Sequence, residues 1–191
     1  PMAQQINHMI QHGYQFAFIS GTKNIDLQKM LSSRITQPHH LLGTTGTQYV
    51  KINQNNTPQI IYSHTFTPSE KNEIITALNA LITTYNIQSH TTKEDQLQDR
   101  DSQLTLSAIG RHAPSEIKAQ FDPNGTIRLQ WIEFLKQHLD KTKYDINIGG
   151  TTSIDITRKG LNKEWGIRTF LQHNNYNPNH VLFFGDKMHP G

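Results

Sequence analysis

The 191-residue sequence predicts an α/β fold with a parallel, Rossmann-like sheet, interrupted by an α+β insertion. Its first residues follow the order helix, strand, helix, which is typical of parallel sheets. A helix followed by an apolar run restores that order near residue 180. Between these two parts, helices and extended runs follow one another without that order. We therefore expect a core domain formed by residues 1–65 and 156–191, and an inserted domain formed by residues 66–155.

The first part of the core domain is expected to hold two helices and three strands. Apolar residues spaced three and four positions apart predict one helix ending near residue 12 and another after Gly21. The apolar run Tyr14–Ser20 between them predicts a strand. The runs Thr47–Ile52 and Gln59–His64, joined by a turn rich in Asn and Pro, predict a hairpin. The inward faces of the helices are expected to hold Ile6, Met9, Ile10, Leu27, Met30 and Leu31.

The inserted domain is expected to begin with a helix at Pro68. Residues 97–109 alternate between polar and apolar side chains and predict extended structure. A short helix over residues 114–122 and a longer one follow, and then extended runs over residues 144–150 and 153–157. The inward faces of the two long helices are expected to hold Ile74, Ile75, Leu78, Leu81, Ile82, Leu129, Ile132, Phe134, Leu135 and Leu139.

The last part of the core domain is expected to be one helix and one strand. Residues 161–174 predict the helix, with Trp165, Ile167 and Leu171 facing inward. Residues 180–186, His-Val-Leu-Phe-Phe-Gly-Asp, predict a buried strand because four apolar side chains follow one another.

Composition excludes several classes of function. A net charge of +3, without a basic run or aromatic residues interleaved with basic ones, predicts no nucleic-acid partner. No apolar stretch is long enough for a membrane span, so no membrane partner is expected. The chain has no Cys, which excludes disulfides, thiolate metal sites and a Cys nucleophile, and fits a cytoplasmic enzyme.

Two other features carry weaker signals. His39 and His40, like the other histidines, lack the spacing of a zinc site, and we expect them at the surface. The stretch Gly43–Thr47, Gly-Thr-Thr-Gly-Thr, lacks both a Lys and a clear preceding strand, and we expect a loop.

Three polar residues lie at strand ends or beside them. Ser20 ends the first predicted strand, Asp186 ends the last, and Lys163 lies early in the helix before that last strand. Ligands bind beyond the carboxyl ends of parallel strands, where a hydroxyl, an ammonium and a carboxylate together bind phosphate and a magnesium ion. Taken singly, each residue is more typical of a helix cap, a turn or a solvated surface than of a site, so the argument depends on their order.

Three stretches resemble the second, third and fourth motifs of the haloacid-dehalogenase-type phosphatases. They are Phe-Ala-Phe-Ile-Ser-Gly-Thr, Gly-Leu-Asn-Lys-Glu-Trp-Gly-Ile and Val-Leu-Phe-Phe-Gly-Asp-Lys-Met-His-Pro-Gly. The inserted domain resembles the larger α+β cap of that superfamily, type IIB. Within it, the last stretch is most similar to the eukaryotic-type phosphomannomutases. The resemblance implies that Ser20 binds phosphoryl oxygens, that Lys163 offsets their charge, and that Asp186 binds Mg²⁺.

Two stretches of the cap support the same subgroup. Asp99–Arg111 resembles a stretch in which two arginines grip a sugar phosphate, here Arg100 and Arg111, eleven residues apart. Arginine suits this task because its guanidinium binds phosphate in a bidentate way. We expect the two arginines on paired strands; the alternative is that they are strand-face charges paired with neighbouring aspartates.

Three more residues of the cap are implicated by the resemblance. Gly149–Thr157 resembles a stretch whose Ser-x-Asp contacts sugar hydroxyls, here Ser153 and Asp155. Lys118 lies roughly where these mutases carry a third phosphate-binding arginine, and a lysine would serve there as a point charge without bidentate geometry.

One part of the family pattern is missing. The superfamily's nucleophile is the first Asp of an Asp-x-Asp motif after an apolar strand, and the chain's Asp99-Arg100-Asp101 follows no such strand. We expect the nucleophile and the second carboxylate of the last motif to lie outside residues 1–191.

The sequence as a whole predicts a Mg²⁺-dependent phosphotransferase that acts on hexose phosphates through an aspartyl-phosphate. Its partner would be a small sugar phosphate, and the oligomer that we consider is a homodimer formed through the cap. The alternatives are a sugar-phosphate phosphatase of the same superfamily and a non-catalytic module that binds sugar phosphates.

Overall fold

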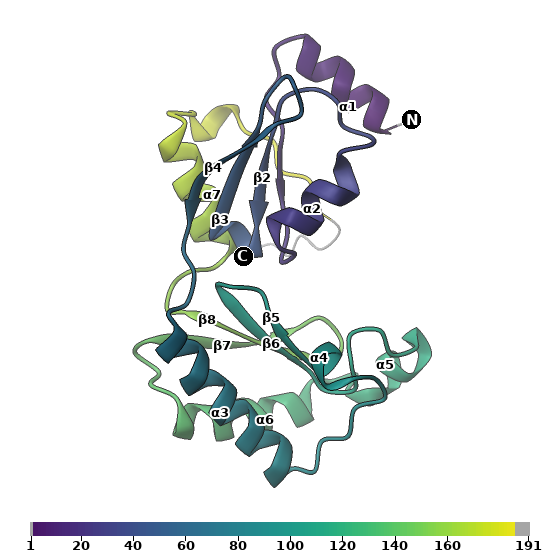
Figure 1. The fold of residues 1–191 in the computed structure, drawn as a ribbon, viewed down its shortest axis with the longest axis vertical. Coiled ribbons are helices and arrows are strands. Elements are labelled where there is room, and N and C mark those ends of the chain that lie inside the picture. Colours follow the sequence, from purple (N-terminus) through teal and green to yellow (C-terminus); the bar gives the residue numbers. More distant parts are fainter. Residues whose placement is uncertain (1, 186–191) are drawn as a thin grey trace.

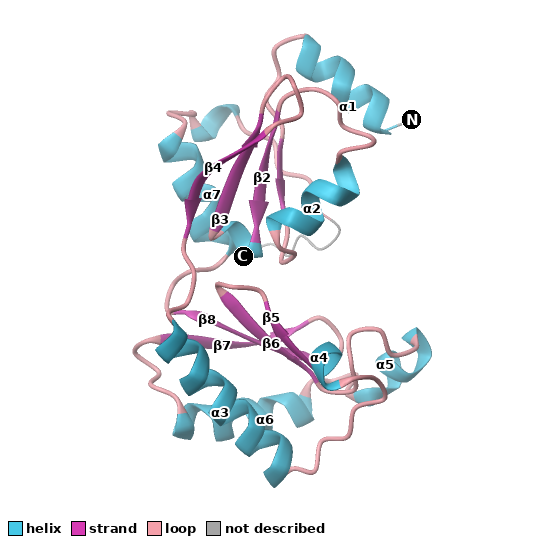
Figure 2. Cartoon of the chain, in the orientation of Figure 1, coloured by secondary structure: helices cyan, strands magenta, loops and turns pink. Residues whose placement is uncertain are grey.

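The computed structural model of the protein describes residues 2–185, which form two lobes stacked along the long axis (Figure 1). Each lobe contains one four-stranded sheet (Figure 2). The elements of the first lobe are α1 (Met2–Gln11), β1 (Ala17–Ile19), α2 (Asn24–Leu31), β2 (His39–Gly43), η1 (Thr44–Gly46), β3 (Gln48–Ile52), β4 (Pro58–Ser63), α7 (Lys163–His173) and η2 (Pro178–His180). Those of the second lobe are α3 (Pro68–Thr84), α4 (Lys93–Gln96), β5 (Leu97–Asp99), β6 (Gln103–Ser107), α5 (Ser115–Phe121), α6 (Thr126–His138), β7 (Tyr144–Gly149) and β8 (Ser153–Arg158).

The first lobe is a sheet of order β1-β2-β3-β4 between helices. β1 and β2 are parallel, and β2, β3 and β4 continue as an antiparallel meander. On one face, Leu27 of α2 packs with Leu41 and Ile52. On the other face, Phe170 of α7 packs with Leu42 and Tyr49. The helices cover the sheet on both sides, so the predicted α/β fold class with a Rossmann-like core is confirmed.

The second lobe is an antiparallel sheet of order β5-β6-β8-β7 backed by α3 and α6. Side chains alternate across a strand, and Leu104 and Leu106 of β6 point with Ile156 of β8 into the core that the helices cover. The opposite face of the sheet is turned toward the first lobe (Figure 1). Four polar residues stand in one row across that face, as the strand register pairs them: Gln98, Thr105, Asp155 and Asn147.

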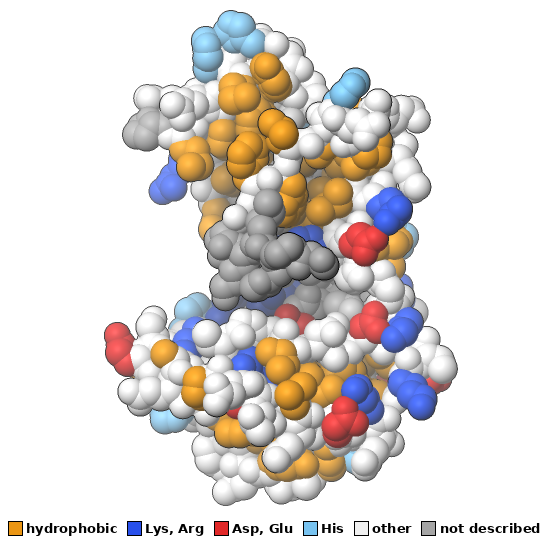
Figure 3. Space-filling model, turned by 180° about the vertical axis from the view of Figure 1, so that it is seen from behind, with side chains coloured by type: hydrophobic (Ala, Val, Ile, Leu, Met, Phe, Trp, Pro, Cys, Tyr) orange, Lys and Arg blue, Asp and Glu red, His pale blue; other side chains and the backbone are white. Residues whose placement is uncertain are grey.

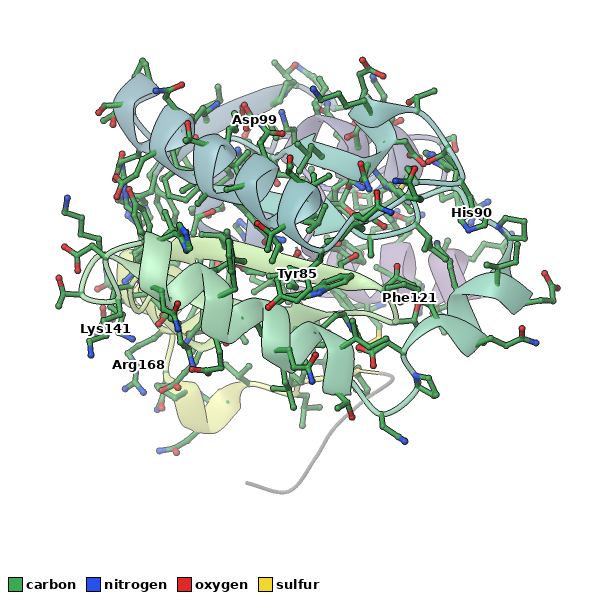
Figure 4. All side chains as sticks on the ribbon, turned by 90° about the horizontal axis from the view of Figure 1, so that it is seen from below. Tyr85, His90, Asp99, Phe121, Lys141 and Arg168 are labelled. Carbon is green, nitrogen blue, oxygen red and sulfur yellow. The ribbon has the colours of Figure 1, made fainter. Side chains whose placement is uncertain are left out.

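Local sequence signals explain where α3 begins and how the helices of the second lobe, the cap, pack together. Thr67 caps α3 by accepting a hydrogen bond from the backbone N–H of Glu70, whose carboxylate accepts the N–H of Thr67 in return. At the other end of the helix, Tyr85 contacts the ring of Trp131, which Phe121 contacts as well. Figure 4 shows Tyr85 and Phe121 on the helical side of the cap. These aromatic contacts join α3, α5 and α6 into one layer.

Most predicted helices and strands are present, and the differences are local. Of the run Tyr14–Ser20, only Ala17–Ile19 forms a strand, β1. Met9 of α1, Met30 of α2 and Leu129 of α6 were expected to face inward, but their side chains are exposed. Each lies at the margin of its apolar stripe, where the helix faces solvent rather than the sheet.

The expectation for His39 and His40 was wrong. Both are buried and both belong to β2, so the stretch Gly43–Thr47 does follow a strand and contains η1. Nδ1 of His40 lies 2.8 Å from the hydroxyl of Tyr49, and its ring packs at 5.1 Å from the ring of Phe170. A neutral imidazole with such partners is stable inside a core.

The buried strand expected over residues 180–186 is also not found. Residues 181–185 belong to no strand, and the side chains of Leu182 and Phe184 are 84% and 83% exposed. Seen from behind, apolar side chains gather on the surface of the first lobe (Figure 3). A strand forms only where a neighbour completes its hydrogen bonds, and no strand among residues 2–185 pairs with this run. Asp186 lies outside the described residues.

We propose that the chain divides into its two domains at the segments that connect the lobes, residues 64–67 and 159–162. The expected division near residue 156 would cut β8, which continues to Arg158 in the cap sheet. Among residues 2–185, no helix has the length and the apolar character needed to cross a membrane.

Candidate functional site

A cleft of about 340 Å³ lies between the two lobes. The loop after β1 forms one wall, and β5 with the segments on either side of it forms the other. The lining residues are Thr22, Lys23, Asp26, Glu94, Leu97, Gln98, Asp99, Arg100 and Arg111. Both arginines predicted to bind phosphate therefore line the cleft.

Ser20 lies directly after β1, at the rim of the core sheet. Its backbone N–H donates to the carbonyl of Leu42 at 3.0 Å, and its own carbonyl accepts the N–H of Thr45 at 2.8 Å. Its hydroxyl accepts the N–H of Thr22 at 3.2 Å, which turns the chain into the cleft. Ser20 itself does not line the cleft, but Thr22 and Lys23, which follow it, do, and sequence reasoning missed both.

Lys163 is the first residue of α7 and is exposed. Asn162 caps this helix by accepting the N–H of Trp165 at 2.9 Å, which fixes where the helix begins. One turn further on, Gly166 packs against the backbone of Thr45 and Gly46 in η1. Because Thr45 also donates to Ser20, η1 connects the predicted phosphate-binding serine to the helix that carries the predicted lysine.

Arg100 reaches from the cap to the core. Its Nη1 donates to the carbonyl of Gly21 at 3.1 Å, and its Nη2 donates to Oε1 of Gln98 at 2.8 Å. Burial lowers the pKa of Arg100, the negative charge of Asp155 opposes that shift, and the positive charge of Arg111 adds to it. Asp155 and Arg111 therefore both lie within electrostatic reach of Arg100. Arg100 follows the end of β5, and it pairs with neither Asp99 nor Asp101.

Arg111 lies in the loop between β6 and α5 rather than on a strand. It is exposed, and its backbone N–H donates to the carbonyl of Asp95 at 3.2 Å. Nζ of Lys118 donates to the carbonyl oxygen of Arg111. Lys118 thus braces the loop that carries Arg111.

Asp155 stands on the polar face of the cap sheet. Its Oδ1 accepts a hydrogen bond of 2.7 Å from the hydroxyl of Thr105, which accepts one of 3.0 Å from the side-chain amide of Gln103. This chain of hydrogen bonds orients the carboxylate. Ser153 lies two residues earlier in β8 and shares that face. The alternation of Gln-Leu-Thr-Leu-Ser in β6 is the signal from which Gln103 and Thr105 could have been found.

The turn Asp99–Ser102 of the second lobe contacts the first lobe through its side chains. Oδ2 of Asp101 lies 3.1 Å from Nζ of Lys23 and accepts a hydrogen bond of 3.3 Å from the amide of Gln48. The hydroxyls of Thr47 and Ser102 are 2.5 Å apart. The chain's Asp-x-Asp therefore holds the cap against the core in this structure.

The described residues do not by themselves form a metal centre. Within residues 2–185, no three His, Asp or Glu side chains come close enough to hold an ion. The predicted ligand, Asp186, lies outside this part of the chain.

Comparison with known proteins decides the family. The sequence profile of the eukaryotic phosphomannomutases matches residues 4–191. The chain belongs to this family. It is therefore related to enzymes of the haloacid-dehalogenase type, as the sequence predicted. The phosphomannomutase of Drosophila melanogaster is 30% identical to it over 98 residues, and that of Saccharomyces cerevisiae is 30% identical over 98 residues.

The match to these relatives is partial. It covers 50% of the chain but 38% of the Drosophila enzyme and 37% of the yeast enzyme. Among solved structures, the Streptococcus mutans protein SMU.1108c has a TM-score of 0.65 at 16% identity, covering 96% of this chain and 73% of that one. The Plasmodium falciparum IMP-nucleotidase has a TM-score of 0.55 at 13% identity, covering 92% and 51%. At such identities these structures support the fold alone.

Proposed function

We propose that this chain binds a hexose phosphate in the cleft between its lobes, as part of a phosphomannomutase-like phosphotransferase. The observation that supports this most directly is the convergence of Arg100 and Arg111 on one cleft whose opposite wall is the loop after Ser20. Guanidinium groups bind phosphate in a bidentate way, and backbone N–H groups and hydroxyls in a turn bind it as well.

Each lobe would recognise a different part of the substrate. The two arginines would hold the phosphate that is not transferred, with Lys118 supporting the loop of Arg111. On the polar face of the cap sheet, the carboxylate of Asp155 would accept hydrogen bonds from sugar hydroxyls, and the hydroxyl of Ser153 would donate or accept them. Ser20 would contact oxygens of the phosphate to be transferred, and Lys163 would offset its charge.

We further propose that the transfer proceeds through an aspartyl-phosphate and requires Mg²⁺, with Asp186 as one ligand. When bound, the ion would neutralise charge on the phosphoryl group. The side chains of this chain that would contact the substrate are those named above: Arg100, Arg111, Ser153, Asp155, Ser20 and Lys163. Asp99 and Asp101 receive no role in the transfer, because both form ion pairs with lysines.

Titration calorimetry of the 191-residue chain with mannose 1-phosphate tests the proposal, with unphosphorylated mannose as control. We expect binding of the phosphate ester that is at least tenfold tighter than that of the sugar, because a charge-assisted contact contributes about 1.5–3 kcal/mol. Arg111→Ala should remove most of this preference, whereas Arg168→Ala, on the exposed side of α7, should keep it. Equal affinity for the two ligands would contradict the proposal.

Mutase and phosphatase activity are separated by following the product. Mannose 1-phosphate incubated with an active protein containing this chain should yield mannose 6-phosphate if it is a mutase. Release of inorganic phosphate without that product would replace the mutase by a sugar-phosphate phosphatase.

A further inference from the structure

A second cavity, of about 460 Å³, adjoins the cleft on the cap. Glu94, Gln98 and Arg111 line both cavities, so Arg111 stands at their boundary. The residues that line only the second cavity are Thr91, Thr92, Asp95 and His112. None of these has a role in the function proposed above.

Asp95 holds His112 in one orientation. Its Oδ1 lies 2.6 Å from Nδ1 of the His112 ring, and its Oδ2 accepts the backbone N–H of His112 at 2.9 Å. Burial raises the pKa of the Asp95 carboxyl, but hydrogen bonds from His112 and from the hydroxyl of Thr91 outweigh burial, so that its pKa lies below its ordinary value. The carboxylate is therefore charged near neutral pH and favours a proton on Nδ1.

This orientation leaves the other ring nitrogen free for a ligand. Nε2 is on the side of the ring opposite the bond to Asp95, and the His112 side chain is 76% exposed while that of Asp95 is only 12% exposed. The ring is thus anchored at one end and open to the cavity at the other. A histidine held in this way loses little further freedom when it binds a ligand.

The charges around His112 suit an anion. Arg111 and Lys118 supply positive charge from the same loop and from α5, and Glu94 and Asp95 supply negative charge from α4. The carboxylate of Asp95 is directed at the ring and the backbone N–H of His112. A phosphate monoester carries a charge of about −1.5 to −2 near pH 7, and Glu94, which lines both cavities, offsets part of the positive charge that Arg100 and Arg111 supply.

We propose that His112, oriented by Asp95, is a specificity-determining residue that binds the same phosphate group as Arg111, through Nε2. The inference rests on the proposed function, since it concerns the hexose phosphate in the adjoining cleft. Because Asp95 favours the proton on Nδ1, Nε2 would donate to the phosphate when the ring is doubly protonated, and the ring then also adds a full positive charge. The phosphate site then changes its affinity with pH through a residue of the cap.

The test is titration calorimetry with mannose 1-phosphate at pH 6 and pH 8, for the unaltered chain, His112→Gln and Asp95→Asn. His138→Gln is the matched control, because His138 is a cap histidine on α6 that bonds to the carbonyl of Phe134. We expect His112→Gln to weaken binding about tenfold at pH 6 and less than threefold at pH 8, with unphosphorylated mannose unaffected. Asp95→Asn should weaken binding in the same direction but by less, and His138→Gln should leave it unchanged.

Comparing each variant with the unaltered chain at the same pH removes the titration of the phosphate itself, whose second pKa is about 6. Binding by the unaltered chain together with equal affinity of His112→Gln at pH 6 would overturn this inference and leave the proposed function intact. Absence of any binding by the unaltered chain would overturn both. Circular dichroism of each variant checks that a loss of affinity does not come from unfolding.

Discussion

The Cα atom of Gly166 lies 2.5 Å from the place that a Cβ atom would occupy on Gly46. The two glycines let α7 approach η1 more closely than any pair with side chains could, and Gly46 also has a φ of +95°. This contact fixes α7, and with it Lys163, against the loop that follows Ser20.

Gly166→Ala should therefore disturb the core. The added methyl group would meet the carbonyl oxygen of Thr45, which is backbone and cannot rotate away. We expect a loss of stability of about 1–3 kcal/mol, as for other overpacked sites, and a lower melting temperature in circular dichroism. Gln172→Ala, on the exposed side of the same helix, is the control and should leave the melting temperature within error. An unchanged melting temperature for Gly166→Ala would show that α7 moves away from η1 at little cost.

The buried ion pair of the cap should matter more than its surface pairs. Nε of Arg128 lies 2.8 Å from Oδ2 of Asp122, both side chains are nearly inaccessible, and Nη1 of Arg128 also donates to the carbonyls of Gly149 and Gly150. Arg128→Met leaves a buried carboxylate without its cation, so we expect a loss of about 3–5 kcal/mol.

Urea unfolding of the chain measures this loss. The control is Lys136→Met, which breaks an exposed pair with Glu133 and should cost less than about 1 kcal/mol. Because Arg128 holds the loop that precedes Ser153, we also expect weaker binding of mannose 1-phosphate by Arg128→Met. Similar losses for the two variants would mean that the buried pair is dispensable.

The stability of the core lobe should fall in mild acid because of His40. Burial, with smaller contributions from the charges of Lys51 and His39, lowers its pKa from 6.5 to about 4 in the folded protein. The unfolded chain therefore binds a proton near pH 6.5 that the folded chain accepts only near pH 4. The stability that the neutral ring contributes is complete above pH 6.5 and is lost progressively between pH 6.5 and pH 4, by about 3 kcal/mol for such a shift.

Urea unfolding at a series of pH values measures this slope, which should be smaller in His40→Gln. His138→Gln serves as the control, because it replaces an exposed histidine of α6. A slope equal in His40→Gln and in the unaltered chain would show that other carboxyl and imidazole groups cause it.

Asp101→Asn should loosen the connection between the lobes. It removes the charge that Lys23 contacts at 3.1 Å but keeps a residue type that tolerates the φ of +67° found at this position. We expect a larger radius of gyration in small-angle X-ray scattering and little change in melting temperature, because exposed ion pairs contribute about 0–1 kcal/mol. Glu133→Gln breaks the ion pair with Lys136 within α6 of the cap and should leave the radius of gyration unchanged. A radius that increases equally in both variants would speak against a specific role for Asp101.

Periodic patterns made much of this fold predictable. The spacing of apolar residues in α3 and their alternation in β7 and β8 predict these elements from the sequence, because each element buries one face against one core. The strand β2 was missed because two of its five residues are histidines, whose burial depends on Tyr49 and Phe170 from other elements. The run over residues 181–185 was misjudged for the opposite reason, since four apolar side chains favour a strand but cannot supply the neighbour that a strand requires.

The sequence indicated two of the residues that line the cleft but not their contacts. The resemblance of residues 99–111 to a sugar-phosphate-binding stretch predicted that Arg100 and Arg111 bind phosphate, and both line the cleft. The hydrogen bond from Arg100 to the carbonyl of Gly21 joins residues 79 positions apart, and no local sequence pattern predicts such a contact. The same is true of His112, whose partner Asp95 lies 17 positions away across the β5–β6 hairpin.

The contact between Arg100 and Gly21 couples two equilibria. The guanidinium that would bind a phosphate already donates one N–H of Nη1 to a carbonyl of the other lobe, so a ligand that uses this N–H must compete with that carbonyl. By thermodynamic reciprocity, whatever separates the lobes raises the affinity of Arg100 for an anion, and an anion on Arg100 favours separation to the same extent. The ligand would therefore enter the cleft most readily when the lobes are apart. The free energy of separating the lobes is offset by the contact between the ligand and Arg100, which the separation frees from Gly21.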